Sequence, residues 1–370
     1  MKNMRINQNF ISMLDKLNIT AILKSFSLVS FANIIKLVIS FVCIKLIAIM
    51  LGPSGVALIG QLNNFVAMIM SFSGGGIMTG ITKYVAENRD SEERSKDYIS
   101  TAFRITIYFS LTIGLLLVLL HDFISRKVLL SPDYGPVFIL FGSTLFLYAL
   151  NTMILCLLNG YQELRKYVIV NLSGSSIGLF LTLLLIFPFG LIGAMISIVT
   201  TQSITFFVSC WMIRNYPWMS WSYFSGKFNK KIGLKYMKYS LMILISTVFN
   251  SPILMIIRWS IISNISIVKA GYWEGINRIS GAYLSIIVAF FSTYYLPNIS
   301  RINNEIMIKT EIFNLYKVII PVVAFFFVLI YLLRSVVIRV LFTANTCAKK
   351  FLFSSFLDYF GKNDCIMAKI

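Results

Sequence analysis

Long runs of apolar residues are the feature that most restricts how this sequence can fold. A helix that crosses a bilayer needs about 20 mainly apolar residues, and nine such runs occur along the chain. They cover residues 25–49, 56–82, 100–120, 137–159, 168–187, 191–213, 239–258, 272–296 and 313–333. Short Gly/Pro segments, Gly52–Gly55 and Pro188–Gly190, connect two pairs of these runs. Because membrane strands would show short alternating segments instead, the sequence predicts an all-α, polytopic helical bundle.

Composition excludes several other classes of protein. Hydrophobic residues make up 58% of the chain and charged residues only 13%, whereas soluble domains are about a quarter charged. The net charge of +19 does not indicate a nucleic-acid partner, because Lys and Arg stand mostly between apolar runs. The single histidine, His121, and five scattered cysteines without a C-x-x-C pair provide no metal set. We therefore expect no metal, no cofactor and no catalytic residue.

The distribution of positive charge predicts the orientation in the membrane. With the N-terminus in the cytoplasm, the cytoplasmic segments contain 19 Lys and Arg and the opposite segments 5. Such a bias follows the positive-inside rule. The segment 214–238 on the cytoplasmic side combines basic residues with the aromatic residues Trp218, Trp221, Tyr216 and Tyr223, and Trp211 comes just before it. This pattern is typical of a linker that lies on anionic lipid headgroups.

Ionisable side chains inside the predicted spans carry the strongest functional signal, because each is unfavourable in hydrocarbon unless it meets water or a partner. They are Lys36, Lys45, Arg104, Arg258, Glu274 and Arg278. Glu274 and Arg278 are four residues apart, so we expect them to pair on one helix face. The other four cations have no evident counter-ion in the sequence. Such cations predict a cavity that binds an anion, whereas a pump for cationic drugs would need buried carboxylates.

An alternative reading of these cations is that they snorkel to the membrane interface. It applies best to Arg104 and Arg258, which lie near span ends. Lys36 lies about 18 Å along its helix and is harder to explain in this way. Nine residues separate Lys36 from Lys45, a rotation of roughly 180°, so both can face one cavity only if the helix bends or the cavity is wide.

Helix-breaking residues indicate possible gating positions. Gly74, Gly75 and Gly76 interrupt the second span, Gly80 follows them, and Pro252 lies in the seventh. Interrupted helices often flank transporter sites, although close helix packing explains glycines equally well. The Gly52–Gly55 segment also has a weak counterpart about 218 residues later at Gly271, which would fit an internal repeat.

Several segments together resemble a known family. They are Leu46–Gly55, Gly76–Ala86, Asn159–Tyr161, Gly271–Leu284 and Tyr295–Arg301. Their order over roughly residues 20–345 is similar to that in the O-antigen and enterobacterial-common-antigen flippases of the multidrug/oligosaccharidyl-lipid/polysaccharide exporter superfamily. The resemblance implies a two-lobed exporter fold of the bacterial inner membrane, with twelve spans, around a cationic cavity.

The same resemblance implies the cargo and the residues that hold it. The cargo would be an undecaprenyl-pyrophosphate-linked oligosaccharide moved to the periplasmic leaflet by alternating access, driven by a proton, sodium or the membrane potential. Besides membrane lipids, polymerase and chain-length proteins of the pathway are further candidate partners. Four candidates for binding the pyrophosphate lie where the family is basic: Lys36, Lys45, Lys83 and Arg258. Two more, Arg104 and Arg278, are candidates only because they are cations within the predicted spans.

The predicted organisation has five parts: a cytoplasmic segment (1–24), an N-lobe of six spans (25–213), the linker (214–238), an incomplete C-lobe of three spans (239–345) and a polar tail (346–370). Since the likeness fades near residue 345, we expect a truncation or frameshift there.

Two alternatives to a flippase remain. One is a membrane polymerase or glycosyltransferase, although His121, Asp122 and Asp133 form no recognisable acid–base set; the other is a non-functional truncated product.

Overall fold

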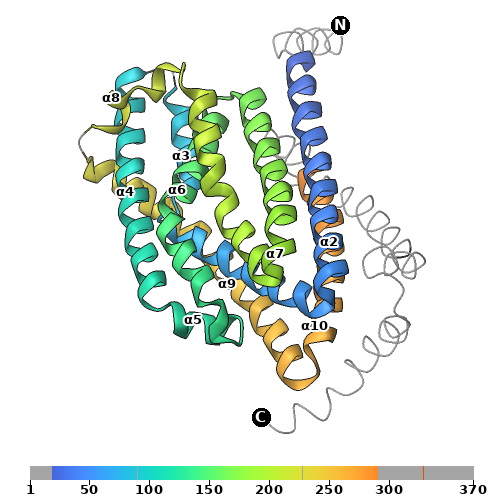
Figure 1. Cartoon of the computed structure of the whole chain (residues 1–370). Coiled ribbons are helices and arrows are strands. Elements are labelled where there is room, and N and C mark those ends of the chain that lie inside the picture. The colour runs from blue at the N-terminus through green and yellow to red at the C-terminus, as the bar shows by residue number, and fades with distance from the viewer. Residues whose placement is uncertain (1–18, 90, 227, 291–327, 329–370) are drawn as a thin grey trace, which may run out of the picture. The chain divides into compact units, whose positions relative to one another are not determined.

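Every element that the structure describes is helical, which confirms the all-α prediction. This computed structural model describes residues 19–89, 91–226 and 228–290, together with Val328. The principal helices are α2 (Ile19–Ser73), α3 (Met78–Glu87), α4 (Glu92–Leu119), α5 (His121–Val128), α6 (Gly135–Gly160), α7 (Leu164–Ile213), α8 (Trp221–Phe224), α9 (Lys230–Asn264) and α10 (Ile267–Phe290) (Figure 1). Short 3-10 turns, η1 (Pro132–Tyr134) and η2 (Pro217–Met219), complete the described chain. The predicted span 313–333 and the tail 346–370 lie outside the described residues.

Four described helical stretches are long and apolar enough to cross a membrane: Phe31–Ser73, Glu92–Leu119, Pro132–Gly160 and Leu164–Ile213. The first and last contain one residue each with non-helical backbone angles, Gly52 (φ 68°) and Gly190 (φ 54°). Glycine adopts positive φ without steric penalty. Both glycines lie in the segments that the sequence marks as connections, so α2 and α7 each join two of the predicted apolar runs.

The glycine run after α2 breaks the helix as the sequence predicts. α2 ends at Ser73, Gly75 and Gly76 have positive φ (60° and 69°), and α3 begins at Met78. The freed N–H groups of Gly75 and Gly76 donate to the carbonyls of Phe72 (2.8 Å) and Ser71 (3.0 Å). By contrast, α9 continues through Pro252 to Asn264. A gating role for these positions stays a prediction.

The described residues pack into two compact units. One contains Ile59–Ile257 and the described chain before Ile44; the other contains Ile44–Leu58 and the described chain from Arg258 onward. The boundaries of the two predicted lobes stay predictions.

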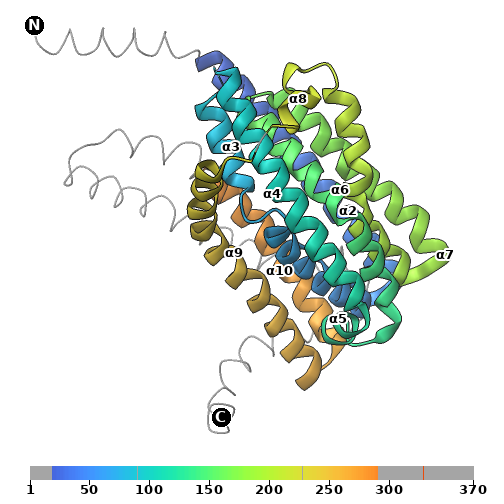
Figure 2. The same ribbon diagram turned by 90° about the vertical axis from the view of Figure 1, so that its left-hand side faces the viewer.

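In the first unit, α6 is the central helix, with α4 on one side and α7 on the other (Figures 1 and 2). The backbones of α4 and α6 touch at Gly114 and Gly142. A Cβ atom added at either glycine would lie 2.5 Å from the carbonyl oxygen of the other. Small residues allow this closeness, which gives membrane helices their packing energy.

Polar side chains in the same core are paired across helices. Asn151 on α6 is fully buried. Its Nδ2 donates to Gln202 Oε1 (2.7 Å), and its Oδ1 accepts from Ser209 Oγ (2.6 Å), both on α7. Ser203 Oγ of α7 donates to the carbonyl of Thr144 (3.0 Å). Hydrogen bonds of this kind join membrane helices where the hydrophobic effect cannot.

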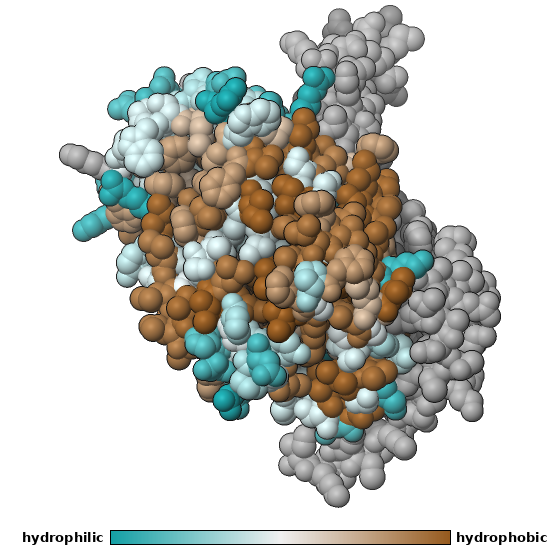
Figure 3. Space-filling model, viewed as in Figure 1, coloured by the Kyte–Doolittle hydropathy of each residue, from teal (hydrophilic) through white to brown (hydrophobic). Residues whose placement is uncertain are grey.

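The surface of this unit has the pattern expected in a bilayer. Figure 3 shows an apolar face over α4 and α7, with polar side chains gathered near α8 and near α5. Large apolar side chains of the same helices are exposed, among them Leu119 of α4 (67%) and Phe180 of α7 (63%). An apolar surface between two polar ends matches contact with hydrocarbon rather than water.

The aromatic linker is partly buried, which corrects the expectation that it lies on lipid headgroups as a whole. Trp218 stacks between Tyr161 and Tyr216, with ring centroids 5.3 Å apart in both pairs. Trp218 and Tyr223 are buried because η2 and α8 fold against the end of the bundle. Trp211 and Trp221 remain exposed, so only these two keep the interfacial interpretation.

Replacing Asn151 tests the polar contact between α6 and α7. We expect Asn151→Ala to lower the free energy of unfolding by about 1–2 kcal/mol, because two hydrogen bonds are lost and their partners stay in the core. Thermal unfolding of the purified chain in one detergent measures this. Asn171→Ala is the matched control, since the Asn171 side chain donates to Tyr167 O within its own helix. Equal loss of stability in both variants would contradict the interpretation.

Candidate functional site

The most deeply buried charges of the described chain form a cluster in the second unit. Arg258 near the end of α9 is fully buried, and Glu274 on α10 is 4% exposed. Arg258 Nη2 donates to Glu274 Oε2, while Arg278 Nε donates to Glu274 Oε1 (2.9 Å). The guanidinium of Arg258 also lies 5.3 Å from the ring centroid of Trp273, within the range of a cation–π interaction.

This arrangement confirms one prediction and corrects another. Glu274 and Arg278 pair at i,i+4 as their spacing predicts. Arg258, however, is not without a counter-ion, because α10 follows α9 after a turn and brings Glu274 onto it. Two arginines share one carboxylate, so the three side chains together carry one surplus positive charge. Arg278, which is partly exposed, is the member through which this charge can reach an anion.

A glycine places α10 so that Glu274 can reach Arg258. Gly271 touches the backbone of Pro53, and a Cβ atom at position 271 would overlap the Pro53 carbonyl. Pro53 follows the positive-φ residue Gly52. Gly271, three residues before Glu274 in α10, therefore lies against the turn within α2.

Lys83 lies beside a group of aromatic side chains in the first unit. Its ammonium lies 4.8 Å from the ring centroid of Tyr239 and 5.5 Å from that of Tyr84, and 4.0 Å from Glu87 Oε1. Gly80, one turn earlier, leaves room for Tyr239 and for the buried Tyr236. Lys83 is therefore stabilised by aromatic faces and a carboxylate. Its contact with a tyrosine of α9 could not be predicted, because Tyr239 is far from Lys83 in the sequence.

Lys36 and Lys45 are both exposed along α2. Among the residues that the structure describes, neither forms an ion pair within 4.0 Å. The backbone between them is helical, since Gly52 is where α2 departs from helical angles. They therefore lie on opposite faces of one helix, and the structure provides no bend that turns both to one side.

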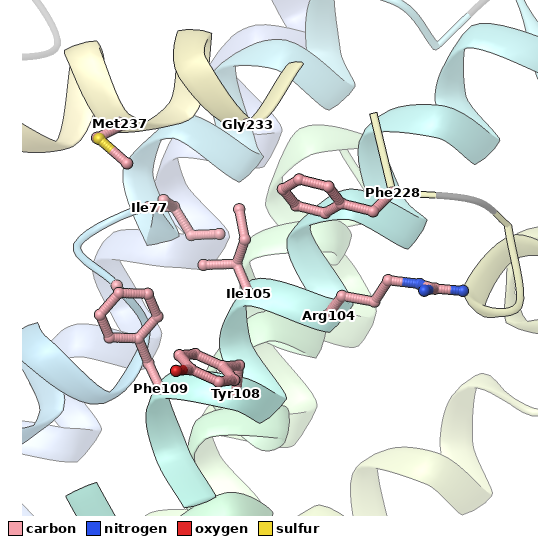
Figure 4. A pocket seen from close by; sticks show the side chains of 9 residues that line it. Ile77, Arg104, Ile105, Tyr108, Phe109, Phe228, Gly233 and Met237 are labelled. Atoms are coloured by element: carbon pink, nitrogen blue, oxygen red, sulfur yellow. The ribbon is translucent and has the colours of Figure 1, made fainter. Parts of the chain in front are cut away.

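Arg104 lies at the edge of an apolar pocket of about 500 Å³ in the first unit. The pocket is lined by Gly75, Ile77, Arg104, Ile105, Tyr108, Phe109, Phe228, Gly233 and Met237. Figure 4 shows the Arg104 guanidinium extending away from the apolar side chains. Lys36, Lys83 and Arg104 belong to one unit, while Lys45, Arg258 and Arg278 belong to the other. A single cavity lined by all six cations stays a prediction.

Comparisons with known proteins place the chain in a family. Residues 22–303 match the family described as "Polysaccharide biosynthesis protein". The chain belongs to this family. It is 26% identical over 310 residues to the lipid III flippase of Escherichia coli (strain K12) and, equally, to that of Shigella flexneri. The match covers 84% of this chain and 74% of each relative, and it confirms the resemblance found in the sequence.

Solved structures of transporters share the fold of this family member. An inward-facing MATE family transporter of the MOP superfamily superposes with a TM-score of 0.63 at 16% identity, covering 86% of this chain and 76% of that one. An outward-facing MATE transporter gives 0.59 at 17% identity, with 86% and 78% covered. Together with the apolar helices, these matches make the chain a multi-pass membrane protein.

Neutralising the carboxylate tests the cluster of this family member. We expect Glu274→Gln to destabilise the protein by about 3–5 kcal/mol, because two buried or half-buried arginines lose the carboxylate that they share. Thermal unfolding and the yield of folded protein in detergent measure the loss. Glu87→Gln is the control, since Glu87 forms an exposed pair with Lys83 and surface pairs contribute little. A Glu274→Gln protein as stable as this control would contradict the cluster.

A second variant tests how α10 is positioned. Gly271→Ala places a methyl group against the Pro53 backbone, which cannot move like a side chain, so we expect a loss of about 1–3 kcal/mol or more. Gly281→Ala on the same helix has nothing within 4 Å of the added carbon and should be neutral or stabilising through helix propensity. Thermal unfolding compares the two, and equal midpoints would show that α10 does not contact the turn.

Proposed function

We propose that this chain is a flippase that moves a lipid-linked oligosaccharide across the membrane. The observation that carries the proposal is the match to two relatives named lipid III flippases over 74% of their length. Since these relatives are named as flippases and not as transferases, the match does not favour the alternative of a polymerase or glycosyltransferase.

The charge of the described helices supports an anionic cargo. The arginine cluster has one positive charge in excess, and Lys36 and Lys45 add exposed cations within a predicted span. A diphosphate that joins lipid and sugar would bind such cations through charge-assisted hydrogen bonds. We infer that the carrier lipid is undecaprenyl pyrophosphate and that Arg278 contacts its phosphates. Lys36 and Lys45 lie on opposite faces of α2, so both join this contact only where the cavity is wide enough to surround the helix. In this scheme Arg258 positions Glu274, and Lys83 with its tyrosines holds the sugar end.

The proposed transport route is from the cytoplasmic to the periplasmic leaflet of the bacterial inner membrane, with the N-terminus in the cytoplasm. The bias of Lys and Arg supports this orientation. No covalent step is involved: the protein opens alternately to each side. The energy source would be a coupling ion, proton or sodium, or the membrane potential, and polymerase and chain-length proteins of the pathway would act on the product.

A transport assay tests the proposal directly. The full chain is expressed in a bacterial strain that lacks its lipid III flippase, and surface polysaccharide is measured by immunoblot. Proteoliposomes with a fluorescent lipid-linked oligosaccharide then give the rate. Rescue and translocation above protein-free vesicles are expected. Failure of both, with folded protein in the membrane, would overturn the proposed function.

Arg278→Gln tests the surplus charge separately. The variant leaves Arg258 and Glu274 as a neutral pair, so its thermal stability should stay close to that of the original chain. We expect its translocation rate to fall at least about tenfold, because one charge-assisted hydrogen bond of about 1.5–3 kcal/mol is lost. Arg126→Gln on α5 is the control for loss of one positive charge. If Arg278→Gln transports as fast as this control, the cluster does not bind the cargo.

A further inference from the structure

The pocket beside Arg104 has the shape of a site for a lipid chain. Its walls come from the segment between α2 and α3, from one and a half turns of α4 (Arg104–Phe109), and from Phe228 with the first two turns of α9. Two glycines form part of the wall. A Cβ atom at Gly75 would lie 2.9 Å from Ile105 Cγ2, and one at Gly233 would lie 3.0 Å from Phe228 Cζ. Aliphatic and aromatic carbon therefore makes up most of the lining, and the hydroxyl of Tyr108 lies beside Phe109 (Figure 4).

Positive charge lies at the rim of this pocket and not inside it. The aliphatic stem of Arg104 lines the pocket, while its guanidinium extends outward (Figure 4). Arg104 is exposed, and within the described part of the chain no carboxylate pairs with it. Lys230, the first residue of α9, precedes Gly233 by about one turn and lies on the same helix face as Gly233 and Met237. It is exposed as well.

The position along α4 fits the boundary between headgroups and hydrocarbon. Arg104 is four residues beyond the start of the predicted span at residue 100, about 6 Å along the helix axis. A long cationic side chain at this depth reaches back toward the interface. The lining residues Tyr108 (70% exposed) and Met237 (61%) leave the pocket open to the surroundings.

We propose that this pocket binds an anionic phospholipid of the surrounding membrane. The first carbons of one acyl chain occupy the apolar hollow, and the headgroup phosphate contacts Arg104 and Lys230. Charge complementarity selects an anionic headgroup, because basic pockets between membrane helices on the cytoplasmic side attract anionic lipids. An open pocket exchanges with the bulk membrane, where phospholipids are the amphiphiles present in excess. The site is thus a bound-lipid site of the first unit, independent of the cargo that the protein moves.

Photochemical cross-linking tests the lipid site on the full chain. The probe is phosphatidylglycerol with a diazirine in one acyl chain, mixed into vesicles of phosphatidylethanolamine and phosphatidylglycerol. We expect labelled peptides from residues 104–109 and 228–237. Arg104→Gln should lower the yield of these peptides about fivefold, which corresponds to one basic contact with an anionic lipid, and Arg104→Glu should lower it further. Arg126→Glu is the matched control and should retain the yield.

A second variant keeps Arg104 and Lys230 but fills the apolar pocket. Met237→Trp places a large ring over the pocket at an exposed position, and it should reduce labelling while circular dichroism and thermal unfolding stay unchanged. Three results would each overturn the proposal: unchanged labelling in Arg104→Gln, equal labelling of the pocket by a phosphatidylethanolamine probe, or competition by polyprenyl phosphate but not by phosphatidylglycerol. The last result would assign the pocket to the cargo. The transport assay decides the proposed function independently of all three.

Discussion

Hydrocarbon offers no hydrogen-bond partners, and this constraint decides how the chain is built. Each backbone polar group must be satisfied internally, so the membrane segments are helical. Where the helix is interrupted after Ser73, the N–H groups of Gly75 and Gly76 still find carbonyls in the preceding turn. The same constraint acts on side chains, since Asn151 is bonded to two residues of α7. Interruptions and polar residues are therefore tolerated only where a partner is close.

The cations of the spans meet this constraint in different ways. Arg258 is fully buried and bound to a carboxylate, and Lys83 lies against tyrosine rings and Glu87. Arg104 covers apolar carbon with its stem and extends its charge outward (Figure 4). These cations cannot be told apart in the sequence, where each is a single charge within an apolar run, but in the structure they have different surroundings. Among the residues that the structure describes, the arginine cluster alone concentrates two cations on a single carboxylate.

Local features of the structure could be predicted from the sequence, whereas distant contacts could not. Three features depend on residues that are neighbours in the chain: the long apolar helices, the breaks at Gly52 and Gly190, and the pair of Glu274 with Arg278. The partner of Arg258 is 16 residues away across a turn, and nothing in either helix alone indicates it. Similarly, Trp218 has the composition of an interfacial residue, but its burial depends on Tyr161, far earlier in the sequence.

The structure also explains two glycine-containing segments whose role the sequence alone does not show. The segments around Pro53 and Gly271 attract attention in the sequence as faint copies of one another; in the structure they touch, and the glycine is what permits the contact. The glycine run at 74–76 has two consequences, since it ends α2 and also shapes the pocket beside α4. Neither consequence can be read from glycine content alone.

The contact between Gly114 and Gly142 also restricts how this protein can evolve. Each glycine lies against the backbone oxygen of the other, and every amino acid carries that oxygen. A larger residue at one position therefore cannot be accommodated by a smaller one at the other, as it can where two side chains meet. The two positions should each remain glycine without covarying, so that this backbone contact between α4 and α6 would leave no trace in methods that infer contacts from paired substitutions.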